Sequence, residues 1–255
     1  MAVVIVMLFL GGIGYVIYIS SFKKKPLPRL NPIEVENLLL QHVVFYRNLP
    51  ETERKKQFFE RVLHFLQTTR FTDVGKAIHT LEDEILIAAS AMIPLYHFPD
   101  WNYFNLDEIL LYEDAFNTSY ETNEEHAILG MVGEGALQRT MLLSLKSLRQ
   151  GFEKKDAEHT AIHEFVHLID KMDGSIDGVP EFLIPKEMVE PWLRLVRNNM
   201  QQIQQGDSTI DPYAATNEAE FFAVLSEYFF EKPEFLNRNH PVLYQKLRTI
   251  FERHT

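Results

Sequence analysis

The chain has 255 residues and a formal net charge of −11, and it contains no cysteine. Hydrophobic residues make up 46% of it, which is enough for the packed core of one domain or two small ones and excludes a disordered protein. The lack of cysteine excludes disulfides and thiolate metal ligands, so any metal ion must be held by His, Asp or Glu. It also mildly favours a reducing compartment.

The chain begins with an uncharged apolar run, residues 2–19, which is near the length needed to cross a bilayer of roughly 30 Å. The lysines at 23–25 follow this run, whereas a secretory signal places its positive charge before the apolar core. We therefore expect a single transmembrane anchor at 1–21 and a basic, proline-containing linker at 22–31. The positive cluster favours the cytoplasm for the following domain, 32–255. A buried core helix is the alternative for the apolar run.

Every acidic residue lies beyond the linker, where 21 basic and 36 acidic side chains give a net charge of −15. Such a domain repels the phosphate backbone, so nucleic acid is excluded as a partner. The same charge repels anionic lipid, except at the basic linker itself.

Helical patterns dominate the first part of this domain. Apolar residues recur at helical spacing from residue 32 to about 70, with a break at 49–51. They recur again over 81–93, where Pro94 ends the run.

Short β-like runs, separated by polar or glycine-bearing segments, follow between residues 101 and 147. They are 108–112, 127–132 and 138–145. Helical patterns then return at 155–170, 187–205 and 218–230. The order of elements predicts an α+β fold, a mainly helical domain with a small mixed sheet.

The predicted helix 155–170 contains the sequence His163-Glu-Phe-Val-His167. Residues four apart share a face of a helix, so both imidazoles can reach one metal ion while Glu164 stands beside it. A catalytic zinc ion takes three protein ligands and keeps a position for water. A neighbouring carboxylate can take the proton of that water and deliver it to a leaving amine. The motif predicts a hydrolytic zinc site in which Glu164 is the general base.

Two acidic residues are candidates to complete the site. Asp170 extends the polar stripe of His163 and His167, but one helix seldom supplies three ligands of a tetrahedron. We expect Asp170 to orient a histidine or to fix the following loop, and the alternative is a helix-end residue bonded to its own turn. Glu220 lies in a largely apolar helix, where a buried carboxylate needs a partner charge. Its alternative is a capping box with Asn217.

Other residues near the motif have open interpretations. Residues 140–147 directly precede the site helix and are a candidate edge for pairing with substrate backbone, with a plain core strand as the alternative. His159 either lines the cleft or has a capping or solvated role. His97 is expected in a loop.

Two segments together, His163–Asp170 and Tyr213–Phe230, resemble the Mlc titration factor A family of zinc metallopeptidases. More distantly, they resemble the catalytic domain of anthrax lethal factor. The resemblance covers roughly residues 31–235. It implies a zincin-like domain with one zinc ion, in which Glu220 is the third ligand and Tyr213 assists catalysis. A tyrosine hydroxyl beside the zinc can donate a hydrogen bond to the oxyanion. The chain departs from the family in its N-terminal anchor and in Lys171–Asp173, where the family usually has Arg or Asn.

The sequence thus predicts a membrane-anchored zinc metallopeptidase of the gluzincin type, which hydrolyses a peptide or protein substrate. The alternative, implied by the family's name, is a regulatory protein that sequesters a transcription factor and uses zinc mainly for structure. A structural zinc site is closed by four protein ligands and needs no general base. Glu164 therefore favours the enzyme.

Overall fold

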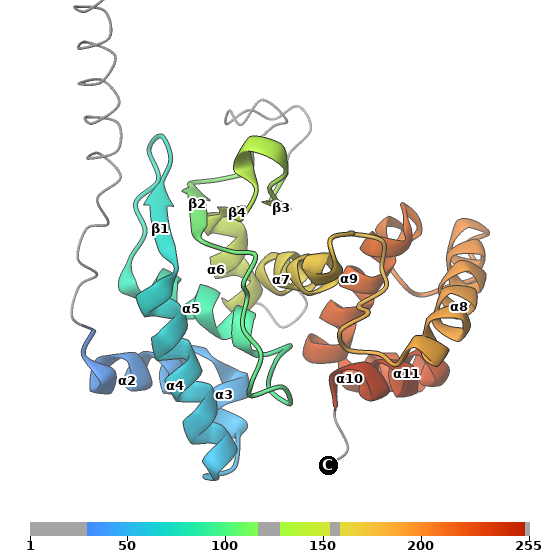
Figure 1. The fold of residues 1–255 in the computed structure, drawn as a ribbon, viewed down its shortest axis with the longest axis horizontal. Coiled ribbons are helices and arrows are strands. Elements are labelled where there is room, and N and C mark those ends of the chain that lie inside the picture. Colours follow the sequence, from blue (N-terminus) through green and yellow to red (C-terminus); the bar gives the residue numbers. More distant parts are fainter. Residues whose placement is uncertain (1–29, 117–127, 154–158, 253–255) are drawn as a thin grey trace, which may run out of the picture. The chain divides into compact units, whose positions relative to one another are not determined.

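The computed structural model describes residues 30–116, 128–153 and 159–252 (Figure 1). Contacts divide the chain into two units, 1–31 and 32–255, and the second contains the fold described below. The predicted anchor and most of the linker lie outside the described residues. Within those residues, no helix combines the length and apolar character needed to span a bilayer.

The described part starts with helices around a buried one. α2 (Pro32–His42), α3 (Val44–Asn48) and α4 (Glu53–Thr68) precede α5 (Leu81–Met92). A capping box starts α5: the Asp83 N–H donates to Thr80 Oγ1, and the Thr80 N–H donates to Asp83 Oδ2 at 2.8 Å. From Ile85 to Met92 every residue of α5 is buried, so this helix is central to the core.

Four strands form one mixed sheet in the order β1-β2-β4-β3. β1 (Arg70–Asp73), β2 (Glu108–Tyr112) and β4 (Thr140–Ser144) are parallel, and β3 (Gly130–Val132) runs antiparallel to β4. Three of the strands lie where the sequence predicts them, and β1 is an addition.

Residues 140–144 form a core strand and not a sheet edge, so the alternative given for residues 140–147 is confirmed. β4 pairs with β2 on one side and β3 on the other, and α6 (Leu145–Glu153) begins directly after it. Within the described residues, the outer strand on this side of the sheet is β3, which runs antiparallel along β4.

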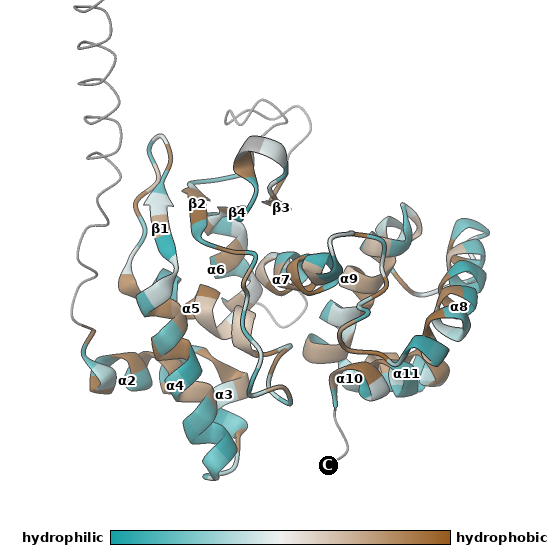
Figure 2. Cartoon of the chain, viewed as in Figure 1, coloured by the Kyte–Doolittle hydropathy of each residue, from teal (hydrophilic) through white to brown (hydrophobic). Residues whose placement is uncertain are grey.

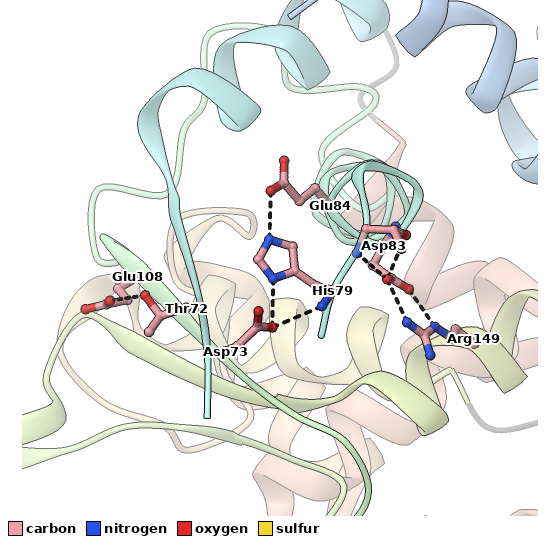
Figure 3. A network of polar contacts seen from close by, with 8 residues as sticks. Thr72, Asp73, His79, Asp83, Glu84, Glu108 and Arg149 are labelled. Atoms are coloured by element: carbon pink, nitrogen blue, oxygen red, sulfur yellow. Dashed lines mark hydrogen bonds and ion pairs between the residues drawn. The ribbon is translucent and has the colours of Figure 1, made fainter. Parts of the chain in front are cut away.

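Polar contacts fasten α5 to its neighbours at the end of the sheet (Figure 3). His79 bridges Asp73 of β1 and Glu84 of α5, at 2.8 and 3.0 Å. Arg149 of α6 donates two hydrogen bonds of 2.8 Å to the buried carboxylate of Asp83. A two-pronged pair of this kind fixes the direction of both helices.

The rest of the domain is helical, as the α+β prediction requires. Three single-turn helices, η1 (Gly135–Leu137), η2 (Lys171–Asp173) and η3 (Pro212–Ala215), lie in the connections. The longer helices are α7 (Thr160–Asp170), α8 (Lys186–Gln204), α9 (Glu218–Glu231), α10 (Pro233–Asn239) and α11 (Pro241–Phe251). Figure 2 colours α8 mostly hydrophilic, and only Trp192, Val196 and Ile203 of this helix are buried. α7 and α9 are largely buried and pack on each other, which brings the two motif segments together.

Candidate metal centre

Two histidines project from α7 toward one point. The Nε2 atoms of His163 and His167 lie 3.0 Å apart, and their rings meet nearly edge to face, with an interplanar angle of 79°. The helix begins at Thr160 and is capped by His159, whose Nδ1 accepts the Ile162 N–H at 3.4 Å. His159 is thus a buried capping residue, one of the alternatives expected for it.

Glu220 of α9 completes a group of three. Its Oε2 lies 3.0 Å from His163 Nε2 and 3.5 Å from His167 Nε2. The Asn217 side chain accepts the Glu220 N–H at 2.9 Å, so Asn217 is the N-cap of α9. The Glu220 carboxylate, however, turns to the histidines, and a full capping box is not formed.

These three residues fit a metal ion. Their ligand atoms all lie within 4.8 Å of one another. Tetrahedral ligands about 2.0–2.1 Å from a zinc ion would be separated by about 3.3 Å, close to the distances above. Burial lowers the pKa of His163, but hydrogen bonds to Glu220 and Glu227 outweigh it and raise the pKa to about 10. Burial raises the pKa of Glu220, yet its bonds to both histidines hold it well below its usual range. The carboxylate thus favours positive charge at this point.

Glu227 lies two turns after Glu220 on the same face of α9, and it orients His163. Its Oε1 accepts the His163 Nδ1–H at 2.7 Å, and its Oε2 accepts the backbone N–H of His159 at 2.8 Å. Because Glu227 accepts the Nδ1 hydrogen, Nε2 is the ring nitrogen that faces Glu220 and is available to a metal ion. Their spacing in the sequence puts Glu220 and Glu227 on one face of α9, but the zinc-binding motif predicts no role for Glu227.

Glu164 is buried and lines the same space as His163. It is 5% exposed, its Oε2 has no hydrogen-bond partner, and burial raises its pKa. β3 approaches it closely: a Cβ at Gly130 would lie 2.6 Å from Glu164 Cγ. Only glycine fits between the strand and this carboxylate.

Tyr213 lies in η3, beside the group of ligands. Asp211 Oδ1 accepts the Tyr213 N–H at 2.8 Å and so caps this turn. The Tyr213 ring centroid is 6.2 Å from that of His163, and the residue is 54% exposed. Its side chain therefore borders both the candidate ligands and solvent.

Asp170 holds the loop after α7. It is 1% exposed, and its Oδ2 accepts the Gly178 N–H at 2.7 Å, while burial raises its pKa to about 7. It forms no hydrogen bond to a histidine of the described residues; both His167 Nδ1 and Asp170 Oδ1 are buried without a partner. The observed contact is with the following loop.

The residues from 21 to 252 match the model of one protein family, the glucose-regulated metallo-peptidase M90 family. The chain belongs to this family. Membership makes it a protein of metallopeptidase type, and the His163, His167 and Glu220 group supplies a possible metal site for it.

Relatives of this M90 chain include proteins named Mlc titration factor A, which confirms the predicted resemblance. The protein from Serratia proteamaculans is 32% identical over 160 residues, which cover 58% of this chain and 60% of the relative. The one from Klebsiella pneumoniae strain 342 is 28% identical over 222 residues, 81% of each chain. An uncharacterised protein of Synechocystis is 31% identical over 252 residues, 93% of this chain and 90% of the relative. The likeness to lethal factor stays a prediction.

Two cavities flank the candidate metal centre of this M90 chain. The first, of about 500 Å³, extends from His163 along α9 to Lys232. The second, of about 670 Å³, extends past His167 to Arg197 of α8. Both are lined by Gly130, His163, Glu164 and Tyr213. These residues therefore lie at the middle of a cleft that continues on both sides.

Proposed function

We propose that the chain is a zinc-dependent metallopeptidase of the gluzincin type, in which His163, His167 and Glu220 hold one zinc ion. The convergence of their ligand atoms from two helices is the observation that carries the proposal. Two imidazoles and a carboxylate form a donor set typical of catalytic zinc, with a position left for water. When bound, the ion would lower the pKa of that water and polarise a carbonyl.

The chain's own residues would then divide the chemistry. Glu164, with one unpartnered oxygen and a pKa raised by burial, would take the proton of the attacking water and pass it to the leaving amine. Tyr213 would donate its O–H to the scissile oxygen as negative charge develops there. The close packing of Gly130 against Glu164 limits where this carboxylate can swing.

The free edge of β3 would bind the peptide backbone. The Gly133 N–H donates to Thr140 O, and the Ser144 N–H donates to Leu129 O, both at 2.8 Å. In an antiparallel ladder such pairs alternate with non-bonded ones, so the polar groups of Gly130 face away from β4. An extended peptide could pair with them as an added strand next to Glu164.

We further propose that the enzyme is anchored in a membrane. Residues 1–21 would form a single-pass anchor with the catalytic domain facing the cytoplasm, and support for this comes from the apolar run and the lysines that follow it. Protease treatment of sealed, right-side-out vesicles tests the topology. Digestion of the domain from the outer face would refute the cytoplasmic placement.

A regulatory binding protein is the second candidate. Several relatives are named Mlc titration factor A, and by analogy this chain would bind a transcription factor. In that case, zinc would serve structure and Glu164 would have no chemical task. The three-ligand group with an adjacent free carboxylate supports the enzyme.

Metal content and peptide turnover of Glu164→Gln and Glu220→Ala distinguish the candidates. We expect Glu164→Gln to bind zinc and lose at least about 100-fold in kcat, as removal of a general base does. Glu220→Ala should lose zinc. Glu234→Ala, an exposed change in α10, is the control. Normal turnover by Glu164→Gln, or full zinc affinity in Glu220→Ala, would rule out the assignment.

A further inference from the structure

One face of α9 carries a third carboxylate beyond those of Glu220 and Glu227. Glu231 lies one helical turn after Glu227 and lines the first cavity together with Asp211. It forms no hydrogen bond or salt bridge with any of the three candidate ligands, so the proposed chemistry does not use it. Its place on the cavity wall makes it a candidate for substrate contact.

Among the described residues, no hydrogen bond or salt bridge holds the Glu231 carboxylate, although the positive charge of Lys232 partly offsets its charge. Both Glu227 oxygens accept hydrogen bonds, and an Asp211 oxygen accepts the Tyr213 N–H. The lysine of this cavity, Lys232, holds its Nζ 5.6 Å from the centre of the Tyr228 ring. Although the Glu231 residue is exposed overall, partial removal of its carboxyl from water, and then the charge of Glu227, raise its pKa to about 7.

The wall of the same cavity contains a buried polar atom without a partner. His159 is 2% exposed, and burial lowers its pKa to about 4, so its ring is neutral near pH 7. Because Nδ1 accepts the Ile162 N–H, the hydrogen of the neutral ring is on Nε2. This Nε2 has no acceptor. A buried donor of this kind costs free energy unless a ligand or water satisfies it.

The second cavity is different in its charges. It also has acidic residues, but Glu218 there pairs with Arg197 at 3.5 Å. The second cavity also has unpartnered buried atoms, Glu164 Oε2 and His167 Nδ1, but both belong to residues of the candidate metal site. Among the described residues, the first cavity combines a carboxylate outside that site with an unpartnered buried donor. A peptide residue can satisfy both, because its carbonyl accepts a hydrogen bond and its side chain can carry a positive charge.

We propose that the first cavity is a specificity pocket for a lysine or arginine side chain of the peptide, with Glu231 and Asp211 facing the cation and His159 Nε2–H donating to a carbonyl of the same peptide. This inference rests on the proposed peptidase function. A volume of about 500 Å³ is ample for one long side chain. Glu231 is thus a specificity-determining residue, and the metal group itself has no contact with it.

Peptide binding tests the pocket apart from catalysis. The probes are N-acetylated fluorescent peptides in pairs that differ at one position. One peptide of a pair carries lysine or arginine there, and the other carries the uncharged counterpart, norleucine or citrulline. Their affinity for the full chain carrying Glu164→Gln is measured by fluorescence anisotropy. We expect a preference of about five- to tenfold for the cation at one position, as a partly desolvated ion pair gives. Glu231→Gln should reduce this preference to less than about twofold, while Glu234→Gln keeps it.

Several results would overturn the inference. Equal binding of the lysine and norleucine peptides is one, and a preference that survives Glu231→Gln is another. Peptides without the acetyl group test whether the pocket binds a free amino end. If they bind equally well with and without lysine, the pocket binds the peptide terminus, and the side-chain assignment is refuted. If the wild type cleaves no peptide but the Glu231-dependent preference is found, the peptidase proposal fails and the pocket stands.

Discussion

At the scale of single residues, Glu227 shows how one carboxylate links the site to the fold. It binds the ring of a candidate ligand, His163, and the backbone of His159 at the start of α7. The ligand's orientation and the position of the helix therefore depend on the same side chain. The sequence could place Glu227 beside Glu220 on α9, but it could not show which partner lay opposite, because α7 and α9 meet only in the folded chain.

Replacing Glu227 should weaken metal binding without removing a ligand. Glu227→Gln loses the charge and can accept only one of the two hydrogen bonds with its single oxygen. We expect zinc affinity to fall about 10- to 100-fold, the usual effect of losing a carboxylate that orients a ligand. Competition with a chromophoric chelator measures this. Glu231→Gln makes the same charge change one turn further along, and an equal loss of affinity there would show a general charge effect only.

At the scale of elements, the strands show what periodicity reveals and what it leaves open. β2, β3 and β4 lie at or near the runs 108–112, 127–132 and 138–145, because short apolar runs bounded by turns are local signals. Because β1 follows α4 without a turn signal, the sequence pattern does not predict this strand. The order of the strands depends on pairing across the chain, so the sequence alone leaves open whether residues 140–147 form an edge or a core strand.

The close approach of β3 to Glu164 predicts that Gly130→Ala damages the site. The added Cβ would lie 2.6 Å from Glu164 Cγ, so either the strand or the carboxylate must shift. We expect a loss of stability of about 1–3 kcal/mol, as in other overpacked sites, and at least about a tenfold fall in peptide turnover. Gly75→Ala, where a Cβ meets open space and only the left-handed backbone is strained, is the control. Urea unfolding and turnover are measured together. Full activity in the Gly130→Ala variant would show that this contact does not position Glu164.

At the scale of the molecule, the candidate centre joins segments more than fifty residues apart. The motif in α7 and the glutamates in α9 have little meaning separately. The family resemblance predicts Glu220 as a third ligand, and the structure brings its carboxylate to the two histidines. The small mixed sheet and the helical majority follow from the patterns, whereas β1, α10 and α11 are not predicted. Their aromatic residues pack behind α9: Phe251 stacks on Phe222, with ring centroids 5.8 Å apart.

Because the three ligands come from both helices, metal binding should stabilise the whole domain. A ligand that binds only the folded state at 1,000 times its Kd adds about 4 kcal/mol to the free energy of unfolding. For a domain of this size, that corresponds to a rise in Tm of roughly 8–16 °C. Calorimetry of the full chain in detergent, with chelator and then with zinc, measures the rise. Glu220→Ala should lose most of it, while Glu218→Ala, which alters the neighbouring carboxylate outside the ligand group, should keep it. An undiminished rise in Glu220→Ala would place the stabilising metal elsewhere in the chain.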